Sequence, residues 1–442
     1  MSKITVDFSK TRGKIKNMNS VNNGPVSSVR AFSNFNDYKA ARIPYARNHD
    51  ASFYSGFGGE FSVDVHRIFR DFSRDVNDPD AYSFKSTDDY VKTTYEAGTK
   101  VFYRLGAAIE HYEKRGTYPP ADFFKWAQIC EHIIRHYTEG WANGFTYDME
   151  YWEIWNEADC RNQDGSNPCW QGTDDEFVDL FVVTYKHLKS CFPNLKIGGP
   201  AFAWQYGCSE LIDKLFTRLN NEGLKLDFYS YHCYSSTVKH YIDDMRRAKG
   251  IVDKYNQSQA ELILNEWNYV RGWVGEDWAY TLKSEKGLKG SSFITAVMCQ
   301  GQIEPVDMLM YYDARPCGMN GMFGTDTFEK LKGYYPIAYF SNLLDLGSYV
   351  PSEIDDDELF VCGATNNEGL GGILLTYYND SDTPRAKNIE IELSSLKENA
   401  NIRLFVLDES RDMEKAMEIT VSGKVKINLD IDIFSTYYID IK

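Results

Sequence analysis

Basic residues are scarce relative to acidic ones in this chain of 442 residues. It has 48 Lys and Arg against 64 Asp and Glu, which gives a formal net charge of −16 and a pI near 5.0. Such an excess of negative charge repels phosphate backbones and anionic lipid surfaces. The composition therefore predicts no nucleic-acid partner, and it indicates a substrate that is not strongly acidic.

Long hydrophobic runs are also missing from the sequence. No segment reaches the ~18 apolar residues that a membrane span needs. The first residues, Met-Ser-Lys-Ile-Thr-Val-Asp, contain neither the apolar core nor the cleavage pattern of a leader peptide. These features predict a protein without a membrane partner, and we expect it in the cytoplasm.

The nine cysteines follow neither a metal-binding nor a disulfide pattern. No C-x-x-C pair occurs, and no group of Cys and His has the spacing of a zinc site. Free thiols in a reducing compartment are therefore expected, although Cys160 and Cys169 bracket a polar loop and can pair if the chain meets an oxidant. No metal and no organic cofactor is implied.

What the sequence does contain, from about residue 15 to 335, is an alternation of short apolar runs with longer amphipathic stretches. The apolar runs predict strands at 14–19, 42–47, 100–105, 151–156, 195–199, 226–232, 261–265 and 308–312. The amphipathic stretches predict helices at 121–137, 174–191, 210–221, 238–255 and 291–302. Helices that follow strands at this rhythm form parallel βα units. The pattern predicts an α/β fold, a (β/α)8 TIM barrel over 13–335. A doubly wound open sheet is the alternative, but its Gly-rich first turn is not well placed here.

The remainder of the chain has a different pattern. Short strands separated by polar turns are predicted at 358–363, 371–378, 388–393, 401–407, 424–429 and 435–441. They indicate a C-terminal antiparallel β-sandwich domain over 336–442. The alternation of Ile4, Val6 and Phe8 within 1–12 predicts an additional edge strand of the same domain.

In a βα barrel, the reacting groups lie at the C-terminal ends of the strands. Two strand ends carry a carboxylate directly after an apolar run, Glu157 and Glu266. A carboxylate is costly there unless it is paired or used. Two such groups in one pocket are the apparatus of glycoside hydrolysis, in which one protonates the leaving oxygen and the other attacks the anomeric carbon. Separations of about 5–5.5 Å and about 6.5–9.5 Å distinguish retention from inversion.

Other polar residues follow the predicted strands and have structural alternatives. His49 and His232 can be hydrogen-bonded core residues, and Glu153 is expected to be an ion-pair partner inside the barrel. The glycines of 56–59 lack the Lys-Ser/Thr of a phosphate loop, so they predict an active-site loop. At the eighth strand end, Asp313 and Arg315 are further candidates for the substrate site.

Trp155-Asn156-Glu157 followed by Asn265-Glu266-Trp267 resembles the motifs of the retaining glycoside hydrolase clan with (β/α)8 barrels. More narrowly, the chain resembles glycoside hydrolase family 39, which includes β-xylosidases and α-L-iduronidases. Further stretches occur in family order, namely Arg47-Asn48-His49, Ile197-Gly198-Gly199-Pro200 and His232-Cys233-Tyr234. The trailing β-sandwich also fits that family.

The resemblance implies that Glu157 is the general acid/base and Glu266 the nucleophile. It implies that the sugar subsite is lined by His49, Asn156, His232 and Tyr234, and we place Trp267, Asp313 and Arg315 beside them. Two departures from the family pattern leave the identity of the sugar undecided. Ala158 stands where Pro usually follows the Asn-Glu pair, and the eighth strand, Tyr311-Tyr312-Asp313, lacks the Trp typical of the xylosidases.

The sequence therefore predicts a retaining hydrolase of β-linked sugars, with an exo-acting β-xylosidase as the first choice. Its partner would be an oligosaccharide or a glycoside. Alternatives are another sugar, such as a β-galactoside or an α-L-arabinopyranoside, endo action on a polysaccharide, and a non-catalytic carbohydrate-binding protein on a hydrolase scaffold. An iduronide needs a cationic clamp, which Arg47, Arg104 or Arg315 could supply. A homo-oligomer is compatible with the resemblance.

Overall fold

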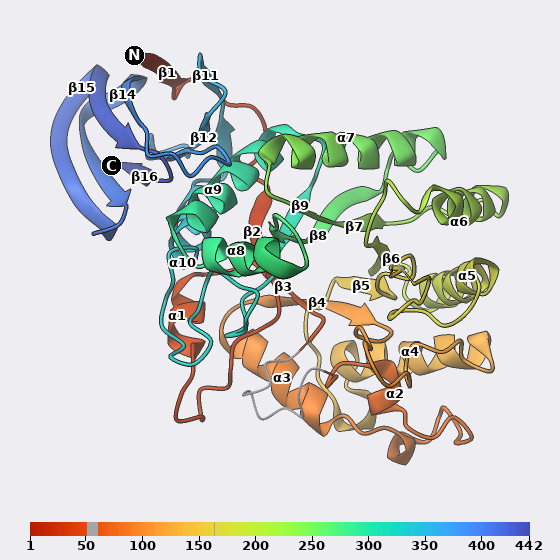
Figure 1. Ribbon diagram of the computed structural model, residues 1–442. Helices are drawn as coiled ribbons and strands as arrows, with labels where there is room; N and C mark the ends of the chain where they lie inside the picture. The colour runs from red at the N-terminus through yellow and green to blue at the C-terminus, as the bar shows by residue number, and fades with distance from the viewer. Residues whose placement is uncertain (51–60, 163) are drawn as a thin grey trace.

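The computed structural model describes residues 1–50, 61–162 and 164–442. The loop predicted at 56–59 lies outside the described residues. Figure 1 shows two bodies, a barrel surrounded by helices and a curved sheet at its side that holds both chain termini. Among the described residues, no helix combines the length and the apolarity that a bilayer crossing requires.

The larger body is a closed barrel of parallel strands in the order β2 to β9, which confirms the predicted (β/α)8 fold. Its strands are β2 (Asn17–Asn22), β3 (Tyr45–Asn48), β4 (Lys100–Leu105), β5 (Tyr151–Ile154), β6 (Lys196–Phe202), β7 (Phe228–Ser235), β8 (Glu261–Tyr269) and β9 (Met308–Tyr311). Its helices are α1 (Phe35–Ala40), α2 (Val65–Ile68), α3 (Lys85–Glu96), α4 (Phe123–Thr138), α5 (Asp174–Cys191), α6 (Ser209–Asn221), α7 (Val238–Lys254), α8 (Gly275–Glu285), α9 (Leu288–Ile303) and α10 (Tyr334–Leu346). Short 3₁₀ turns lie at η2 (Pro79–Ala81) and η3 (Trp141–Asn143).

Local sequence explains why helix α5 matches its predicted bounds. The Thr173 hydroxyl accepts a hydrogen bond from the Glu176 N–H, and the Glu176 carboxylate accepts one from the Thr173 N–H. Such a cap contributes about 1 kcal/mol and defines the first turn. Apolar residues at helical spacing, among them Phe177, Phe181 and Leu188, are buried on one face of the helix.

The smaller body is a mostly antiparallel sheet in the order β10-β12-β13-β16-β14-β1-β11, with β15 paired to β14. Its strands are β1 (Ser2–Asp7), β10 (Ser348–Val350), β11 (Ser352–Ile354), β12 (Leu359–Thr365), β13 (Gly371–Tyr377), β14 (Ala386–Leu407), β15 (Asp412–Asp432) and β16 (Thr436–Ile441). It encloses its own hydrophobic core, which includes Val6, Val361, Leu375, Ile391, Leu404 and Ile439.

Two details of this sheet differ from the sequence-based expectation. Strand β1 is not an edge strand, because it pairs in parallel with β14 on one side and antiparallel with the short β11 on the other. The strands predicted at 388–393 and 401–407 are parts of the single strand β14, which forms a long hairpin with β15. Register shifts interrupt this hairpin, and such bulges let paired strands bend over a core.

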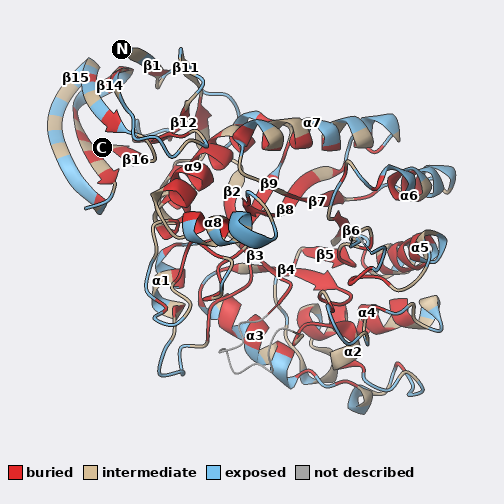
Figure 2. Ribbon diagram, viewed as in Figure 1, coloured by how far each residue is buried: buried red, intermediate tan, exposed pale blue. Residues whose placement is uncertain are grey.

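Helices α9 and α10 join the two bodies. Helix α9 is buried over most of its length because it lies between the barrel and the sheet (Figure 2). Helix α10 contacts β2 of the barrel and β13 of the sheet, and it crosses the boundary predicted at residue 335. The division into 13–335 and 1–12 plus 336–442 stays a prediction.

The barrel interior changes from apolar to polar along its axis. The apolar layer near the start of the strands contains Phe102, Tyr151, Phe228, Ile263 and Met308. Residues two positions later on the same strands share the inward face. On four of the five strands these are the polar residues Arg104, Glu153, Ser230 and Asn265, which are all buried, whereas Met310 stays apolar. The polar layer is therefore the floor of any site at the C-terminal end of the barrel.

Candidate active site

The chain turns sharply after β5, the fourth barrel strand. Trp155 and Glu157 adopt left-handed backbone conformations, with φ of 73° and 49°. Such conformations are uncommon outside glycine and need support from their surroundings. The Trp155 indole Nε1 supplies it by donating to the Cys169 carbonyl at 3.1 Å. Gly106 supplies room, because a Cβ there would lie 3.1 Å from the Trp155 Cα. The turn directs Asn156 and Glu157 over the barrel axis.

A β-bulge directs the second carboxylate inward. Along the β7–β8 pair, Tyr231 lies opposite Leu264 but His232 lies opposite Glu266, so Asn265 is an extra residue in β8. With regular alternation, Glu266 would share the outward face of Leu264. The bulge instead lets Asn265 and Glu266 both contact residues of the barrel interior.

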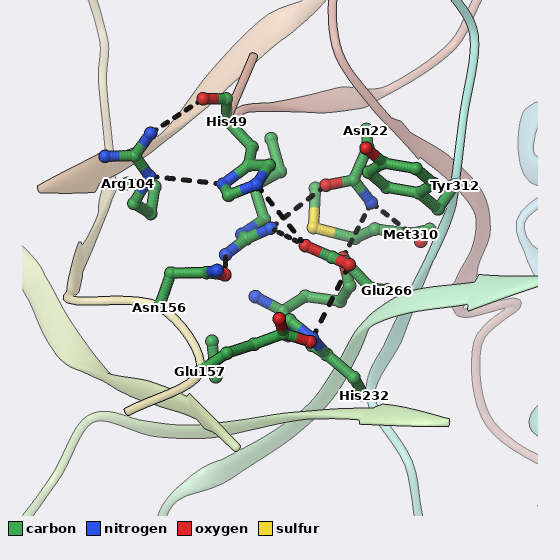
Figure 3. Close-up of polar contacts among 12 residues, drawn as sticks. Asn22, His49, Arg104, Asn156, Glu157, His232, Glu266, Met310 and Tyr312 are labelled. Atoms are coloured by element: carbon green, nitrogen blue, oxygen red, sulfur yellow. Dashed lines mark hydrogen bonds and ion pairs between the residues drawn. The ribbon is translucent and has the colours of Figure 1, made fainter. Parts of the chain in front are cut away.

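Glu157 and Glu266 face each other at the end of the barrel (Figure 3). The His232 Nδ1 lies 2.7 Å from Glu157 Oε1 and 3.5 Å from Glu266 Oε2. One carboxylate oxygen of each Glu lies within 4.8 Å of the other. An oxygen pair this close suits carboxyl groups about 5–5.5 Å apart, as in a nucleophile and acid/base pair, better than groups about 6.5–9.5 Å apart that must admit a water molecule.

The surroundings of Glu266 stabilise its ionised form. Arg47 Nη1 donates to Glu266 Oε1 at 2.7 Å, and the Tyr234 hydroxyl donates to Oε2 at 2.8 Å. Burial by itself would raise the pKa of this carboxyl group. The charges of His232 and Arg47, with the Tyr234 hydrogen bond, outweigh burial and hold the pKa below its usual range. Glu266 is therefore suited to act as a nucleophile.

The surroundings of Glu157 favour its protonated form. Burial raises the pKa of this carboxyl group, and the neighbouring Glu266 raises it further, while the hydrogen bond to His232 opposes both. The other contact of the carboxylate is weak, because the Cys169 thiol Sγ lies 3.8 Å from Oε2. The net shift is upward, as required of a carboxylic acid that donates a proton.

A buried ion-pair network holds both strand ends. Arg47 Nε donates to Glu153 Oε2 at 2.6 Å, and Nη2 donates to Asn156 Oδ1 at 2.7 Å. The Glu153 Oε1 accepts hydrogen bonds from Ser230 Oγ at 2.6 Å and from Asn265 Nδ2 at 2.5 Å. Glu153 is thus the internal ion-pair partner that its position predicted. Removing one partner would leave a buried charge uncompensated, at a cost of about 3–5 kcal/mol.

His49 lies on the nucleophile side of the site as a neutral imidazole. Burial and the cations Arg47 and Arg104 hold its pKa well below the usual range. Arg104 Nε donates to His49 Nδ1 at 3.2 Å, which leaves the ring proton on Nε2. That nitrogen lies 3.9 Å from Glu266 Oε1. It is therefore placed to donate a hydrogen bond into the site.

Arg315 belongs to a second cluster beside His49. Its Nη2 donates to the Tyr312 hydroxyl at 2.9 Å and lies 3.2 Å from Asp50 Oδ2. Asp50 is in turn 3.8 Å from His49 Nε2. The predicted residue Asp313 is fully buried and accepts from Arg315 Nε at 3.0 Å, and burial raises its pKa to about 6. Asp313 therefore positions Arg315 and does not itself reach the two carboxylates.

The structure does not bring Trp267 to the site, contrary to our expectation. Its side chain is fully buried and its ring packs against Tyr241, Phe293 and Tyr311, at centroid distances of 6.0, 6.5 and 5.3 Å. Because Asn265 and Glu266 both point inward at the bulge, the next residue returns to the outward face. Trp267 is a core residue between the barrel and its helices.

Three residues of the site, Asp50, Cys169 and Tyr312, are absent from the sequence-based set, and Arg47 was considered there only as a clamp for an iduronide. Arg47 and Tyr312 end predicted strands and Asp50 follows His49, so their positions beside chosen residues were the available signal. Cys169 carries no such signal, because it belongs to the loop that precedes α5. The expected residues Glu157, Glu266, Asn156, His232 and Tyr234 all take part in the contacts described above.

Two groups at the site contain enough donor atoms for a metal ion. Glu157, His232 and Glu266 form the first, but Arg47 contacts Glu266 and would repel a cation. Glu157 with Cys160 and Cys169 form the second. His232 contacts this group too, because its Nδ1 lies 2.7 Å from Glu157 Oε1, whereas the Cys169 sulfur lies 3.8 Å from the other oxygen, Oε2.

The fold and the site define the class of protein. It is a (β/α)8 barrel with paired carboxylates, of glycosidase type, at the ends of its fourth and seventh strands. Residues 3–266 match the family model described as glycosyl hydrolases family 39. The chain belongs to glycoside hydrolase family 39.

Other proteins resemble this chain in sequence or in fold. A β-xylosidase of Caldicellulosiruptor saccharolyticus is 27% identical over 264 residues, which cover 56% of this chain and 50% of that protein. The chain thus spans about half the length of this relative. Two solved structures share the fold along the whole chain and 99% of their own. They are a glucosidase from Croceicoccus marinus (TM-score 0.83, 18% identity) and a monomeric β-xylosidase from Caulobacter crescentus (TM-score 0.73, 15% identity).

Proposed function

We propose that the protein is a retaining hydrolase of β-glycosides, with a β-xyloside as the first choice of substrate. The observation that carries the proposal is the pair Glu157 and Glu266, whose oxygens lie within 4.8 Å. Their pKa values are shifted in opposite directions. Membership of family 39 and the β-xylosidase relative support the choice of reaction and sugar.

In the first step, a Glu266 oxygen attacks the anomeric carbon. The bond to the leaving oxygen breaks as that oxygen takes the proton of Glu157. A covalent glycosyl-enzyme forms, and Glu157 becomes a carboxylate. His232, at 2.7 Å from Glu157 Oε1, stabilises the new charge.

In the second step, Glu157 takes a proton from water and the water oxygen attacks the anomeric carbon, which releases Glu266. The same residue can act as acid and then as base because its neighbour changes charge. Once Glu266 is esterified it no longer raises the pKa of Glu157, so the carboxylate form is favoured when a base is needed. Two displacements restore the original anomeric configuration.

Several groups are placed to hold the sugar. His49 presents an N–H toward the site, and Asn156 has its oxygen held by Arg47, which leaves its amide N–H groups as donors for a hydroxyl. These groups support binding of a neutral sugar. Arg47 and Arg104 are fully buried and paired with carboxylates, and Arg315 is paired with Asp313 and lies 3.2 Å from Asp50. Such pairing disfavours an iduronide, whose carboxylate needs a cation that is not already neutralised.

A β-glucoside is a second candidate substrate, because the similar fold from Croceicoccus marinus is that of a glucosidase. A β-galactoside, an α-L-arabinopyranoside, endo action and the non-catalytic binding protein stay as alternatives. The cytoplasmic location and the homo-oligomer remain predictions.

Initial rates on nitrophenyl β-xyloside, β-glucoside, β-galactoside, α-L-arabinopyranoside and an iduronide analogue test the proposal. We expect hydrolysis of one neutral sugar, and an NMR time course in which the first-formed product keeps the substrate's anomeric configuration. Inversion would contradict the two-step mechanism. Binding of oligosaccharides without turnover of any aryl glycoside or polysaccharide would favour the non-catalytic protein.

A further inference from the structure

Two cysteines lie beside the carboxylate of Glu157. The sulfurs of Cys160 and Cys169 and one Glu157 oxygen all lie within 4.8 Å of one another. The Cys169 Sγ is 3.8 Å from Glu157 Oε2. Around a tetrahedral zinc ion with Zn–S bonds of about 2.3 Å, ligand sulfurs are about 3.8 Å apart. The three atoms are therefore close to the positions that one such ion requires.

Backbone contacts hold the two thiols in place. The Cys169 N–H donates to Asn167 Oδ1 at 2.8 Å, and the Cys169 carbonyl accepts from the Trp155 indole. The Cys160 N–H donates to the Glu157 carbonyl at 2.9 Å. The thiols belong to a loop whose two ends are thus tied to the same turn, so binding an ion would need little reorganisation.

A cavity reaches one member of this cluster, Cys160. It has a volume of about 450 Å³ and lies between the loops after β5 and β6. Its lining includes the partly exposed Cys160, together with Asp159, Arg161, Asp174 and Trp204. The one cation in that lining, Arg161, is paired with Asp174 at 2.7 Å. The local charge therefore favours entry of a cation.

We propose that Cys160, Cys169 and Glu157 together bind one thiophilic divalent cation, Zn²⁺ or Cd²⁺. Thiolates are the preferred protein ligands of these ions, and each thiol loses its proton as its bond to the metal forms. The bound ion occupies the Glu157 carboxylate, so the leaving oxygen can no longer receive its proton. This inhibition rests on the function proposed above, whereas the binding does not.

A competing group on the helix surface consists of Glu131, His187 and Cys191. Both carboxylate oxygens of Glu131 already have partners, Arg135 Nε at 2.8 Å and His187 Nε2 at 2.6 Å. A metal ion would have to displace the Arg135 guanidinium. Cys191 nevertheless offers a matched control, because it is also a partly exposed free thiol.

The test titrates the fully reduced protein with Cd²⁺ and follows the ultraviolet thiolate-to-cadmium band, with equilibrium dialysis for stoichiometry. We expect one tightly bound Cd²⁺ per chain. Cys160→Ser and Cys169→Ser should each weaken binding by more than about 100-fold, since losing even an outer-shell partner of a metal site costs about 10–100-fold. Cys191→Ser should bind as the wild type does. Circular dichroism checks that each variant folds. If Cys169→Ser does not fold, because Cys169 is buried, the result for Cys160→Ser alone decides whether the metal site exists.

A second readout is the ratio of initial rates with and without Cd²⁺, taken within each variant. We expect inhibition that chelator reverses in wild type and Cys191→Ser, and none at the same concentration in Cys160→Ser. Glu157→Gln should keep the thiolate band but bind more weakly. The site is refuted if Cys160→Ser and Cys169→Ser bind as wild type, or if only Cys191→Ser loses binding. Cysteine-dependent binding without turnover of any glycoside would uphold the site and reject the hydrolase.

Discussion

The turn after β5 and the bulge within β8 present the same residues, Asn followed by Glu, in two different environments. Glu266 accepts from Arg47 and Tyr234, whereas Glu157 is contacted by His232 and by the weak donor Cys169. Burial acts on both carboxyl groups in the same direction. The neighbouring charges and hydrogen bonds differ, and they shift the pKa of Glu266 down and leave that of Glu157 raised. The comparison shows that neighbours, and not residue type, set the direction of each pKa shift, and the two directions match the proposed nucleophile and acid.

Removing the nucleophile should have the largest effect. Glu266→Ala leaves no group to attack the anomeric carbon, so we expect kcat to fall on the order of 10⁵-fold or more for every substrate. Initial rates on an activated aryl glycoside measure this loss. Activity near that of wild type would reject the assignment.

Adding azide to the alanine variants of Glu266 and Glu157 distinguishes the roles of the two carboxylates. In Glu266→Ala it should enter the vacated face directly and give a glycosyl azide of inverted configuration. In Glu157→Ala it should react with the glycosyl-enzyme and give the retained configuration. NMR of the two products reports the anomers, and the same configuration from both variants would contradict the division of roles.

Removing the acid should have an effect that depends on the leaving group. Glu157→Ala should lower kcat/KM by about 10²–10⁴-fold on substrates with poor leaving groups such as a disaccharide. Activated aryl glycosides, whose leaving groups need no proton, should lose far less in the first step. A panel of leaving groups measures the difference, and equal losses across it would argue against an acid.

Removing one hydrogen bond from the nucleophile should have a smaller effect. Tyr234→Phe deletes the hydroxyl that donates to Glu266 Oε2 at 2.8 Å. A hydrogen bond to a charged group is worth about 1.5–3 kcal/mol, so kcat/KM should fall roughly 10–150-fold. The acidic limb of its pH profile should also move to higher pH, because this bond lowers the pKa of Glu266. An unmoved limb would restrict Tyr234 to a structural role.

The pH profile of the wild-type enzyme involves no substitution, and it tests the environments of Glu157 and Glu266 together. Activity needs Glu266 ionised and Glu157 protonated. Activity should be lost as pH falls through the lowered pKa of Glu266, and as pH rises through the raised pKa of Glu157. Values of kcat/KM measured across the pH range define the acidic and the alkaline limb. Glu157→Ala should lose the alkaline limb and keep the acidic one.

Much of the barrel could be predicted because its segments follow simple rules. Helix α5 has a capping box and apolar residues at helical spacing, and β4 contains the apolar run 101–103 between Lys100 and Arg104, so both were predicted with their correct bounds. Strand β2 was placed three residues early. Its polar residues Asn19, Ser20 and Asn22 are buried, where Asn22 donates to the carbonyls of Asn265 and Met310. An apolar pattern cannot mark such a strand.

The sequence by itself determined which groups could meet, because parallel strands place their C-terminal ends at one face of a barrel. That rule singled out Glu157 and Glu266 as a pair in one pocket, and the family resemblance added His49, Asn156, His232 and Tyr234. The tertiary structure decided their orientations and charges. The bulge that turns Glu266 inward and Trp267 outward depends on pairing with β7, and the opposite pKa shifts depend on Arg47 and His232 from other strands. Cys160 lies in the same turn as Glu157, but Cys169 meets that carboxylate only because the loop folds back, and such a contact leaves no periodic signal in the sequence.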